Sequence, residues 1–114
     1  MELRFEGIFL SKKNQKTLIT DSLFFHKIGT DSKEDKLIYN EKDNEFNLSI
    51  SLSRTKKYLF LEISKTESNE FWLLNLEKKN TNLECFLKRK SKHLYYVDDT
   101  PEKFFILSNK NYKK

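Results

Sequence analysis

The chain contains no alanine and few of the residues that punctuate or cross-link a fold. Of its 114 residues, two are glycine, one is proline and one is cysteine. The single cysteine, Cys85, excludes an intrachain disulfide and a metal site built from several cysteines. Its neighbours in LECFLK are largely apolar, so we expect a buried small hydrophobe and not a reactive thiol.

Long apolar runs are also missing. No run approaches the ~18 residues of a membrane span, and the segment MELRFEGIFLSKK lacks the basic start and long apolar stretch of a signal peptide. We therefore expect a cytoplasmic protein without a membrane partner.

Arginine is scarce although the chain is basic. Lys and Arg number 22 against 17 acidic residues, a formal net charge of +5, but only Arg4, Arg54 and Arg89 are arginines. The absence of alanine together with abundant Lys and Asn indicates a low-GC coding bias, which raises the lysine content without requiring an anionic partner. Because bidentate recognition of phosphates and bases favours arginine, we expect no nucleic-acid partner.

Two basic runs, Lys88–Lys92 and Lys110–Lys114, do have aromatic neighbours in Tyr95, Tyr96 and Tyr112. Phosphate contacts combined with base stacking would explain that combination. A solvated turn and a frayed tail explain it better.

The clearest periodic pattern runs from Phe46 to Ser53, where apolar and polar residues alternate strictly. A period of two is typical of a half-buried strand. Short segments rich in aromatic or branched residues follow, each closed by a polar cluster: KYLFLEIS, EFWLLNL, LECFLK, HLYYVDD and KFFILSN. Before Phe46, the looser candidates for strands are GIFLSKK, SLFFHKI and DKLIYNE.

Strand centres recur every ~11 residues, which is the spacing of an antiparallel meander. We therefore predict an all-β fold, and the length fits one small domain or a piece of a larger one. Thr100, Pro101 and Glu102 give the competing signal, because they are arranged like the cap, first turn and early acid of a helix. A helix starting there remains the alternative to the last strand.

The polar turns between these strands form an ordered set of motifs: HKIGTDSKEDKLIYNEKDNEF, SRTKKYLFLEIS, SNEFWLLNLE, FLKRKSKHLYYVD and KFFILSN. This set resembles the N-terminal β-propeller domain of the prolyl oligopeptidase family, and within it most closely the oligopeptidase B (protease II) group. The resemblance runs from about Ile8 to Asn111. Residues that stand where this group has like residues are His26, Ile28, Gly29, Thr30, Asp35, Leu37, Tyr39, Glu41, Asp43, Ser53, Tyr58, Ser68, Glu70, Leu74, His93, Tyr95, Phe104, Ser108 and Asn109.

The resemblance implies that residues 1–114 are a fragment of a peptidase propeller. Propeller blades are four-stranded antiparallel sheets, so Phe46 to Leu87 would make about one full blade, with parts of its two neighbours on either side. In this family, hydrolysis belongs to a Ser-His-Asp triad on a C-terminal α/β-hydrolase domain with a Gly-x-Ser-x-Gly elbow. Since Gly7 and Gly29 are the only glycines, we expect the catalytic domain to be absent from this chain.

Few residues are candidates for chemistry. His26 and His93 are the only histidines. Asp98 and Asp99 are the most notable acids, but no spacing preorganises a nucleophile or supplies a third metal ligand. The ordinary interpretation of each histidine is a hydrogen bond in a turn or at a strand edge. We assign no catalytic, cofactor-binding or metal-binding residue, and we expect no cofactor.

Trp72, beside Phe71, could be a recognition anchor. An apolar strand residue packed between blades is the favoured interpretation.

Two functions remain open. The first is a non-catalytic fragment of an oligopeptidase B-like serine endopeptidase. The resemblance implies that this parent hydrolyses short peptides after basic residues, and that its propeller limits access to the active site. The expected partners are the remaining blades and the hydrolase domain, encoded separately. The alternative is a stand-alone β-domain that acts as a protein-interaction module.

Overall fold

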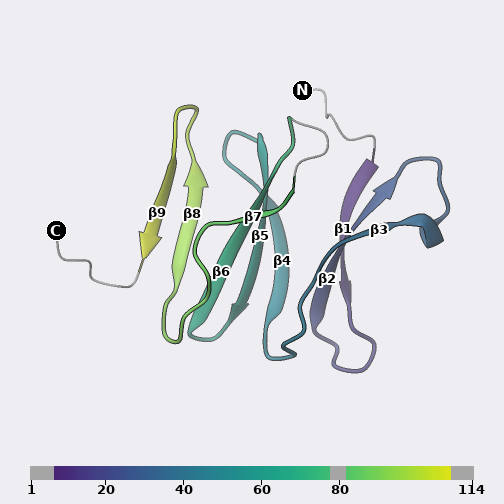
Figure 1. Cartoon of the computed structure of the whole chain (residues 1–114), viewed down its shortest axis with the longest axis horizontal. Coiled ribbons are helices and arrows are strands. Elements are labelled where there is room, and N and C mark those ends of the chain that lie inside the picture. Colours follow the sequence, from purple (N-terminus) through teal and green to yellow (C-terminus); the bar gives the residue numbers. More distant parts are fainter. Residues whose placement is uncertain (1–6, 78–81, 109–114) are drawn as a thin grey trace.

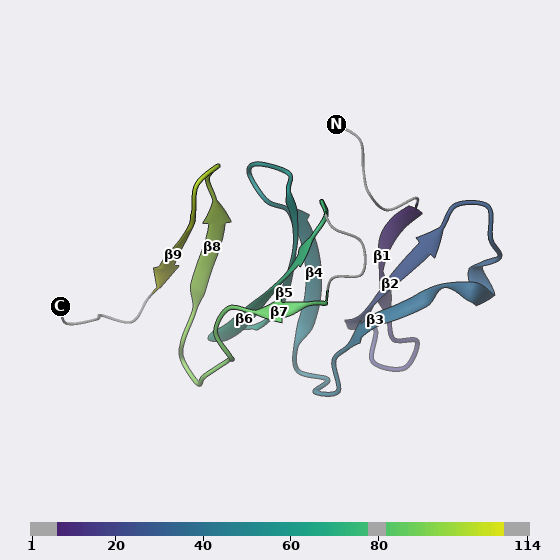
Figure 2. The ribbon, with the colours of Figure 1, turned by 45° about the horizontal axis from the view of Figure 1, so that its top comes forward.

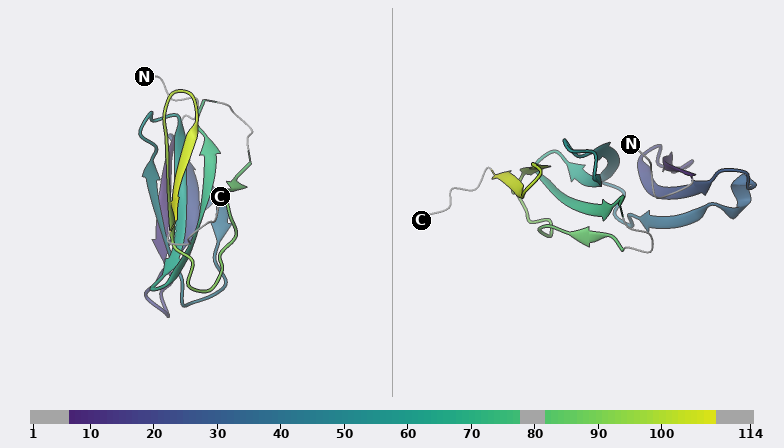
Figure 3. Two further views of the ribbon diagram at one scale, coloured as in Figure 1. Left: turned by 90° about the vertical axis from the view of Figure 1, so that its left-hand side faces the viewer. Right: turned by 90° about the horizontal axis from the view of Figure 1, so that it is seen from above.

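The protein folds into three antiparallel β-sheets that stand face to face in a row (Figure 1). The computed structural model describes residues 7–77 and 82–108. The sheets have the strand orders β1-β2-β3, β4-β5-β6-β7 and β8-β9, and Figure 3 shows the row from above. The body measures 51 × 40 × 17 Å. Its thinnest dimension is close to the width of about four strands side by side.

The strands are short, as the sequence predicts. Their bounds are Gly7–Lys13 (β1), Thr20–Lys27 (β2), Lys36–Asn40 (β3), Asn47–Leu52 (β4), Tyr58–Lys65 (β5), Ser68–Asn75 (β6), Glu84–Cys85 (β7), Tyr95–Asp99 (β8) and Phe104–Ser108 (β9). A single 3-10 turn, η1 (Ser32–Glu34), is the one helical element of the described residues. No described helix has the length and apolar character needed to cross a bilayer.

The middle sheet confirms the predicted full blade between Phe46 and Leu87. Its strands carry apolar residues on both faces, because a neighbouring sheet covers each face. Along β5, Leu59 and Leu61 point to the β1–β3 sheet, whereas Phe60 between them points to the β8–β9 sheet. This alternation follows directly from the period of two in a strand.

We call the contact between the β1–β3 and β4–β7 sheets the first joint. Burying each leucine or phenylalanine side chain stabilises the fold by about 1.5–3 kcal/mol. The buried members of the first joint are Leu23, Phe46, Leu48, Leu59, Leu61, Ile63, Leu74 and Leu76, and the partly buried ones are Phe9, Ile38, Tyr39, Ile50, Trp72 and Leu83.

The second joint is the contact between the β4–β7 and β8–β9 sheets, and it is rich in aromatic rings. Phe60, Phe86 and Phe104 lie with ring centroids 5.1–6.5 Å apart, in tilted or edge-on pairs. Its buried members are Phe60, Phe71, Leu73, Tyr95 and Val97, and its partly buried ones are Tyr58, Phe86 and Phe104.

The connection between β2 and β3 reaches out from the end of the row (Figure 2). Gly29 has a φ of +91° there, which glycine adopts without strain. The Asp31 carboxylate then accepts a hydrogen bond from the Lys33 amide at 3.0 Å and starts η1.

The helix alternative at Thr100 is wrong, because Pro101 and Glu102 form the loop of the β8–β9 hairpin. The Thr100 amide donates to the Lys103 carbonyl at 2.7 Å, and the Lys103 amide donates to the Thr100 hydroxyl at 3.2 Å. These bonds close the turn, and Phe104 pairs with Asp99 in the hairpin ladder.

The predicted strand LECFLK is shorter than expected. β7 covers only Glu84 and Cys85, which pair with Leu73 and Trp72. After Phe86 the ladder ends, because the backbone of Leu87 bonds to the Tyr95 phenol and the amide of Arg89 bonds to Glu70. The side chains of Tyr95 and Glu70 thus make the hydrogen bonds to this backbone that a partner strand would otherwise make.

Candidate functional site

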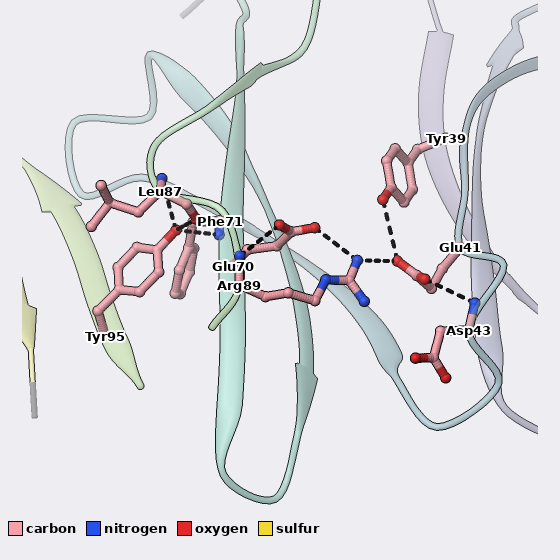
Figure 4. Close-up of polar contacts among 8 residues, drawn as sticks. All are labelled: Tyr39, Glu41, Asp43, Glu70, Phe71, Leu87, Arg89 and Tyr95. Carbon is pink, nitrogen blue, oxygen red and sulfur yellow. Dashed lines mark hydrogen bonds and ion pairs between the residues drawn. The ribbon is translucent and has the colours of Figure 1, made fainter. Parts of the chain in front are cut away.

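An ion-pair network lies at the first joint and centres on Arg89 (Figure 4). Arg89 follows β7, Glu70 belongs to β6, and Glu41 directly follows β3. One guanidinium nitrogen, Arg89 Nη2, lies 2.5 Å from Glu41 Oε1 and 2.8 Å from Glu70 Oε1. The Arg89 amide also donates to Glu70 Oε2 at 3.1 Å. Arg89 therefore binds carboxylates from two sheets at once.

The two carboxylates of this network are almost completely buried, with side-chain exposures of 6% for Glu41 and 4% for Glu70. Burial by itself raises the pKa of Glu70, but the hydrogen bonds and charge of Arg89 outweigh it, so the pKa lies below its usual value. For Arg89, burial acts to lower the pKa, and the two carboxylates raise it above its usual value. Glu70 and Arg89 are therefore both charged at neutral pH.

Neighbouring groups hold the Glu41 carboxylate in place. The Tyr39 hydroxyl donates to Glu41 Oε1 at 3.2 Å, and the Asp43 amide donates to Oε2 at 2.9 Å. Burial, followed by the charges of Glu41 and Glu70, raises the pKa of Tyr39 to about 12. The Arg89 guanidinium carbon also lies 4.0 Å from the centroid of the Phe46 ring, in cation-π geometry.

Tyr95 and Asn69 form a second polar cluster at the second joint. The Tyr95 hydroxyl accepts from the amides of Phe71 at 2.7 Å and Leu87 at 3.2 Å, and donates to the Leu87 carbonyl at 2.7 Å. The Asn69 side chain donates to the Tyr95 carbonyl at 2.8 Å and accepts from the Tyr95 amide at 3.0 Å. Burial raises the pKa of Tyr95 above its usual value, so the phenol stays protonated and can donate.

Asp98 and Asp99 bind the turn between β4 and β5. The Asp98 carboxylate accepts from the Arg54 amide at 2.9 Å, and the Asp99 carboxylate accepts from the Thr55 amide at 3.0 Å and from the Thr55 hydroxyl. Burial by itself raises the pKa of Asp99, but the Thr55 hydrogen bonds outweigh it and the pKa lies below its usual value. These acids position a turn and have no histidine partner.

The structure places the two histidines in different sheets. His26, on β2, lies with Nδ1 2.6 Å from Asp35 Oδ1. His93, just before β8, is 2% exposed and lies with Nε2 2.9 Å from the Ser108 hydroxyl.

Among residues 7–77 and 82–108, the His93 and Ser108 pair has no third member of a catalytic triad. The Nδ1 atom of His93 is buried and has no hydrogen-bond partner among these residues, so no described acid orients the ring as triad chemistry requires. Within residues 7–77 and 82–108, no group of three His, Cys, Asp or Glu side chains could hold a metal ion.

The other residues singled out from the sequence lie in the joints or on the surface. Trp72 packs against Tyr39 in the first joint, with ring centroids 5.5 Å apart, and Lys88 Nζ lies 4.7 Å from the centroid of its ring. Phe71 is buried in the second joint, and Tyr96 is exposed. Cys85 is half-buried, and burial raises the pKa of its thiol. Asn109, Tyr112 and Lys110–Lys114 lie outside the described residues.

A hollow of about 470 Å³ opens beside Arg89, at the end of the molecule where β5 turns into β6. Its basic residues are partly neutralised by carboxylates, since Lys65 pairs with Glu45 at 3.3 Å and Arg89 with Glu41 and Glu70. The residues that line it are Phe46, Lys65, Thr66, Glu67, Ser68, Arg89, Lys90, Ser91 and Lys92.

Sequence reasoning missed the network because it treated Arg89 as one member of a basic run. The available signal was Glu70, a charged residue at the start of the apolar stretch EFWLLNL, since a carboxylate entering a core needs a cationic partner. The sequence does not reveal that the partner is Arg89. Chemically, the described clusters join sheets to one another.

The comparisons with known proteins agree with this architecture. A family model described as the prolyl oligopeptidase N-terminal beta-propeller domain matches residues 4–114. Protease 2 of Moraxella lacunata is 31% identical over 87 residues, which are 76% of this chain and 13% of that protein. Dipeptidyl aminopeptidase BI of Pseudoxanthomonas mexicana is 32% identical over 63 residues, which are 55% of this chain and 9% of that protein.

Among solved structures, oligopeptidase B from Trypanosoma brucei, in a closed form with covalently bound antipain, matches with a TM-score of 0.85 and 26% identity. The match covers 93% of this chain and 15% of that one. Oligopeptidase B from Leishmania major matches in fold with a TM-score of 0.85 at 24% identity, over 95% of this chain and 16% of that one. The chain thus spans between 9% and 16% of the length of these relatives.

Proposed function

The chain belongs to the prolyl oligopeptidase family as part of its N-terminal β-propeller domain, and on this premise we propose that it serves as a non-catalytic propeller segment of an oligopeptidase B-like serine endopeptidase. The observation that carries the proposal is the TM-score of 0.85 with the Trypanosoma brucei oligopeptidase B over 93% of this chain, at 26% identity. The same group provides the 31% identical Protease 2.

The role proposed for the segment is to limit access to the active site of the parent enzyme. That enzyme would hydrolyse short peptides after basic residues, and its propeller would admit peptides while excluding large folded proteins. The packing of the middle sheet supports this role, because both of its faces are buried against neighbouring sheets. Sheets packed together in this way form a continuous barrier that a large folded protein would not cross.

The partners proposed for this segment are further propeller blades and the hydrolase domain, encoded separately. The exposed apolar residues at the two ends of the row support further blades as partners. Ile8 and Leu37, on the β1–β3 sheet, are 50% and 52% exposed, and Tyr96 and Leu107, on the β8–β9 sheet, are 53% and 64% exposed.

The same exposed residues favour the second candidate, a stand-alone β-domain that binds a protein partner. The two candidates differ in their behaviour in solution. A binding module is expected to be a monomer or a defined oligomer, whereas a propeller segment without its neighbouring blades exposes apolar faces that associate without a fixed stoichiometry.

Hydrolysis of short fluorogenic peptides ending in Arg or Lys tests the non-catalytic part of the proposal. The purified chain should show no turnover that a serine-directed covalent inhibitor removes, because the described histidines lack a complete triad. Inhibitor-sensitive turnover that is lost in either the His26→Ala or the His93→Ala variant would contradict it. Matched His→Gln variants at the same positions control for loss of packing.

A further inference from the structure

The two joints are held together by different kinds of contact. At the second joint, hydrogen bonds cross the interface at two separate places, with donors and acceptors on both sheets. The Asn69 side chain bonds to the Tyr95 backbone, and the Tyr95 hydroxyl bonds to the backbone of Phe71 and Leu87. The backbone amide of Asn69 donates to the His93 carbonyl at 3.2 Å. At the other end of the same interface, Asp98 and Asp99 bind the turn at Arg54 and Thr55.

The first joint has a single directional contact in the part of the chain that the structure describes. The bond between Arg89 Nη2 and Glu41 Oε1 is the one side-chain hydrogen bond that links residues 7–41 to residues 46–77 and 82–108. The remaining contacts across this joint join apolar and aromatic side chains, such as Tyr39 and Trp72.

This difference matters because apolar contacts and hydrogen bonds resist movement differently. Apolar attraction is non-directional and roughly proportional to the buried area, so two apolar faces can tilt or slide with little loss of contact. A charge-assisted hydrogen bond requires a heavy-atom distance of about 2.7–2.9 Å and a near-linear angle. The orientation of the β1–β3 sheet therefore depends strongly on one residue, Arg89. The orientation of the β8–β9 sheet is shared among several hydrogen-bonding residues.

The peptide link across the first joint is the short connection from Glu41 to Phe46. Its own bonds are local: the Asp43 amide donates to Glu41 Oε2 at 2.9 Å, the Glu45 amide to Asp43 Oδ1 at 2.9 Å, and the Phe46 amide to the Asp43 carbonyl at 3.1 Å. Glu41 stands at the start of this connection and carries the acceptor for Arg89. The same residue thus begins the link and bears the contact that closes the joint.

We propose that the first joint is a hinge and that the contact between Arg89 and Glu41 is its latch, so that the β1–β3 sheet swings as one body while the β4–β7 and β8–β9 sheets move together as a second body. The latch involves only contacts within this chain, and it stands whether or not the parent protein is a peptidase. In a β-propeller, such a joint would be the position at which two neighbouring blades move apart.

Trp72 reports on this joint directly. It is the one tryptophan of the chain, and its ring packs against Tyr39 across the first joint. Trp72 is partly buried, so the unmodified chain has a basal quenching constant with a neutral quencher such as acrylamide. A rise of the quenching constant above this basal value measures opening at the first joint, and fluorescence permits the measurement at a low concentration of the full chain.

The test compares four variants with the unmodified chain. Glu41→Ala removes the latch and leaves Arg89 paired with Glu70, and Glu41→Gln is the milder change at the same position. Glu45→Ala removes an exposed carboxylate of the same connection, which pairs with Lys65 at the surface. Tyr95→Phe removes hydrogen bonds of the second joint. Far-UV circular dichroism confirms that each variant retains its strands.

We expect the quenching constant of Trp72 to rise about twofold or more in Glu41→Ala, since the joint then samples open states, and to rise less in Glu41→Gln. Glu45→Ala and Tyr95→Phe should leave it at the value of the unmodified chain. The hinge is overturned if folded Glu41→Ala, or folded Glu41→Gln where the alanine variant does not fold, quenches like the unmodified chain. It is equally overturned if Tyr95→Phe raises quenching as much as the Glu41 variants do.

Discussion

Asn69 and Tyr95 bond to each other as two strands of a sheet would, although they belong to different sheets. The Asn69 side-chain amide takes the place of a neighbouring backbone, donating to the Tyr95 carbonyl at 2.8 Å and accepting from the Tyr95 amide at 3.0 Å. The Tyr95 side chain in turn bonds to the backbone at Phe71 and Leu87. The β8–β9 hairpin is therefore docked by reciprocal hydrogen bonds as well as by apolar contact.

Removing the Tyr95 hydroxyl should destabilise the protein. Tyr95→Phe leaves the buried Phe71 amide without its partner, and we expect a loss of about 1–3 kcal/mol in the free energy of unfolding. Urea denaturation followed by circular dichroism measures the change. Tyr96→Phe is the matched control, because Tyr96 is 53% exposed, and it should change stability by less than about 0.5 kcal/mol. Equal effects of the two substitutions would contradict the role given to Tyr95.

Replacing the side-chain nitrogen of Asn69 with an oxygen should also destabilise the protein. Asn69→Asp replaces the donor that faces the Tyr95 carbonyl and the Glu62 carboxylate, 2.8 and 2.9 Å away, with a second acceptor. We expect a loss of about 2–4 kcal/mol, since a buried charge would then face two acceptors. Thermal denaturation measures it, with the exposed Asn44→Asp as the control. A melting temperature unchanged within error would argue against the Asn69 pairing.

Acid should weaken the second joint through Asp99. Its pKa is lower in the folded state than in the unfolded chain, so its contribution is fully present above the unfolded pKa of about 4 and is lost as the pH falls through the folded pKa. Glu70, whose pKa is also lowered, adds to the same dependence. Urea midpoints measured from pH 7 to about pH 3 should therefore fall.

The same midpoints in Asp99→Asn should fall less over that range, whereas Glu67→Gln at an exposed site should follow the unmodified chain. A slope in Asp99→Asn as steep as that of the unmodified chain would show that the acid dependence comes from other groups.

Much of the fold could be predicted because the alternation of Phe46 to Ser53 is a local signal that only a strand satisfies well. At Pro101 the sequence is compatible with two structures, since Thr100 and Glu102 suit a helix start as well as a turn, and the pairing of Phe104 with Asp99 decides between them. The local composition is equally compatible with a helix start and with a hairpin turn.

The ion-pair network could not be predicted from the sequence. Arg89 is separated by 48 residues from Glu41 and by 19 from Glu70, and in the sequence it stands among lysines. Tyr95 and Tyr96 are likewise identical in type, yet one is buried and the other exposed. Alternation requires one of them to point inward, but the backbone groups that the inward phenol meets depend on where the preceding sheet lies.

The isolated chain should self-associate through the ends of its row of sheets. Tyr96 and Leu107 are cross-strand partners on the outer face of the β8–β9 hairpin, 53% and 64% exposed. Leu107→Glu should shift sedimentation velocity profiles towards the monomer, because a charge on this face opposes apolar contact. Leu18→Glu controls for added charge, since Leu18 is 72% exposed but lies in the β1–β2 turn. A concentration-independent monomer in the unmodified chain would contradict the expectation.

The most direct measurement grafts this chain into a full-length relative. Residues 7–108 would replace the equivalent segment of Moraxella lacunata Protease 2, the protein to which 76% of this chain aligns at 31% identity, and peptidase activity would be measured on fluorogenic peptides ending in Arg or Lys. A parallel graft of the Trypanosoma brucei oligopeptidase B segment, a structural match for 93% of this chain, controls for the junctions. If this chain is a propeller segment, its graft should be active, and an additional Glu41→Ala substitution should change the activity more than Glu45→Ala does. An active control graft beside an inactive graft of this chain, proteolysed within the inserted residues, would contradict that conclusion.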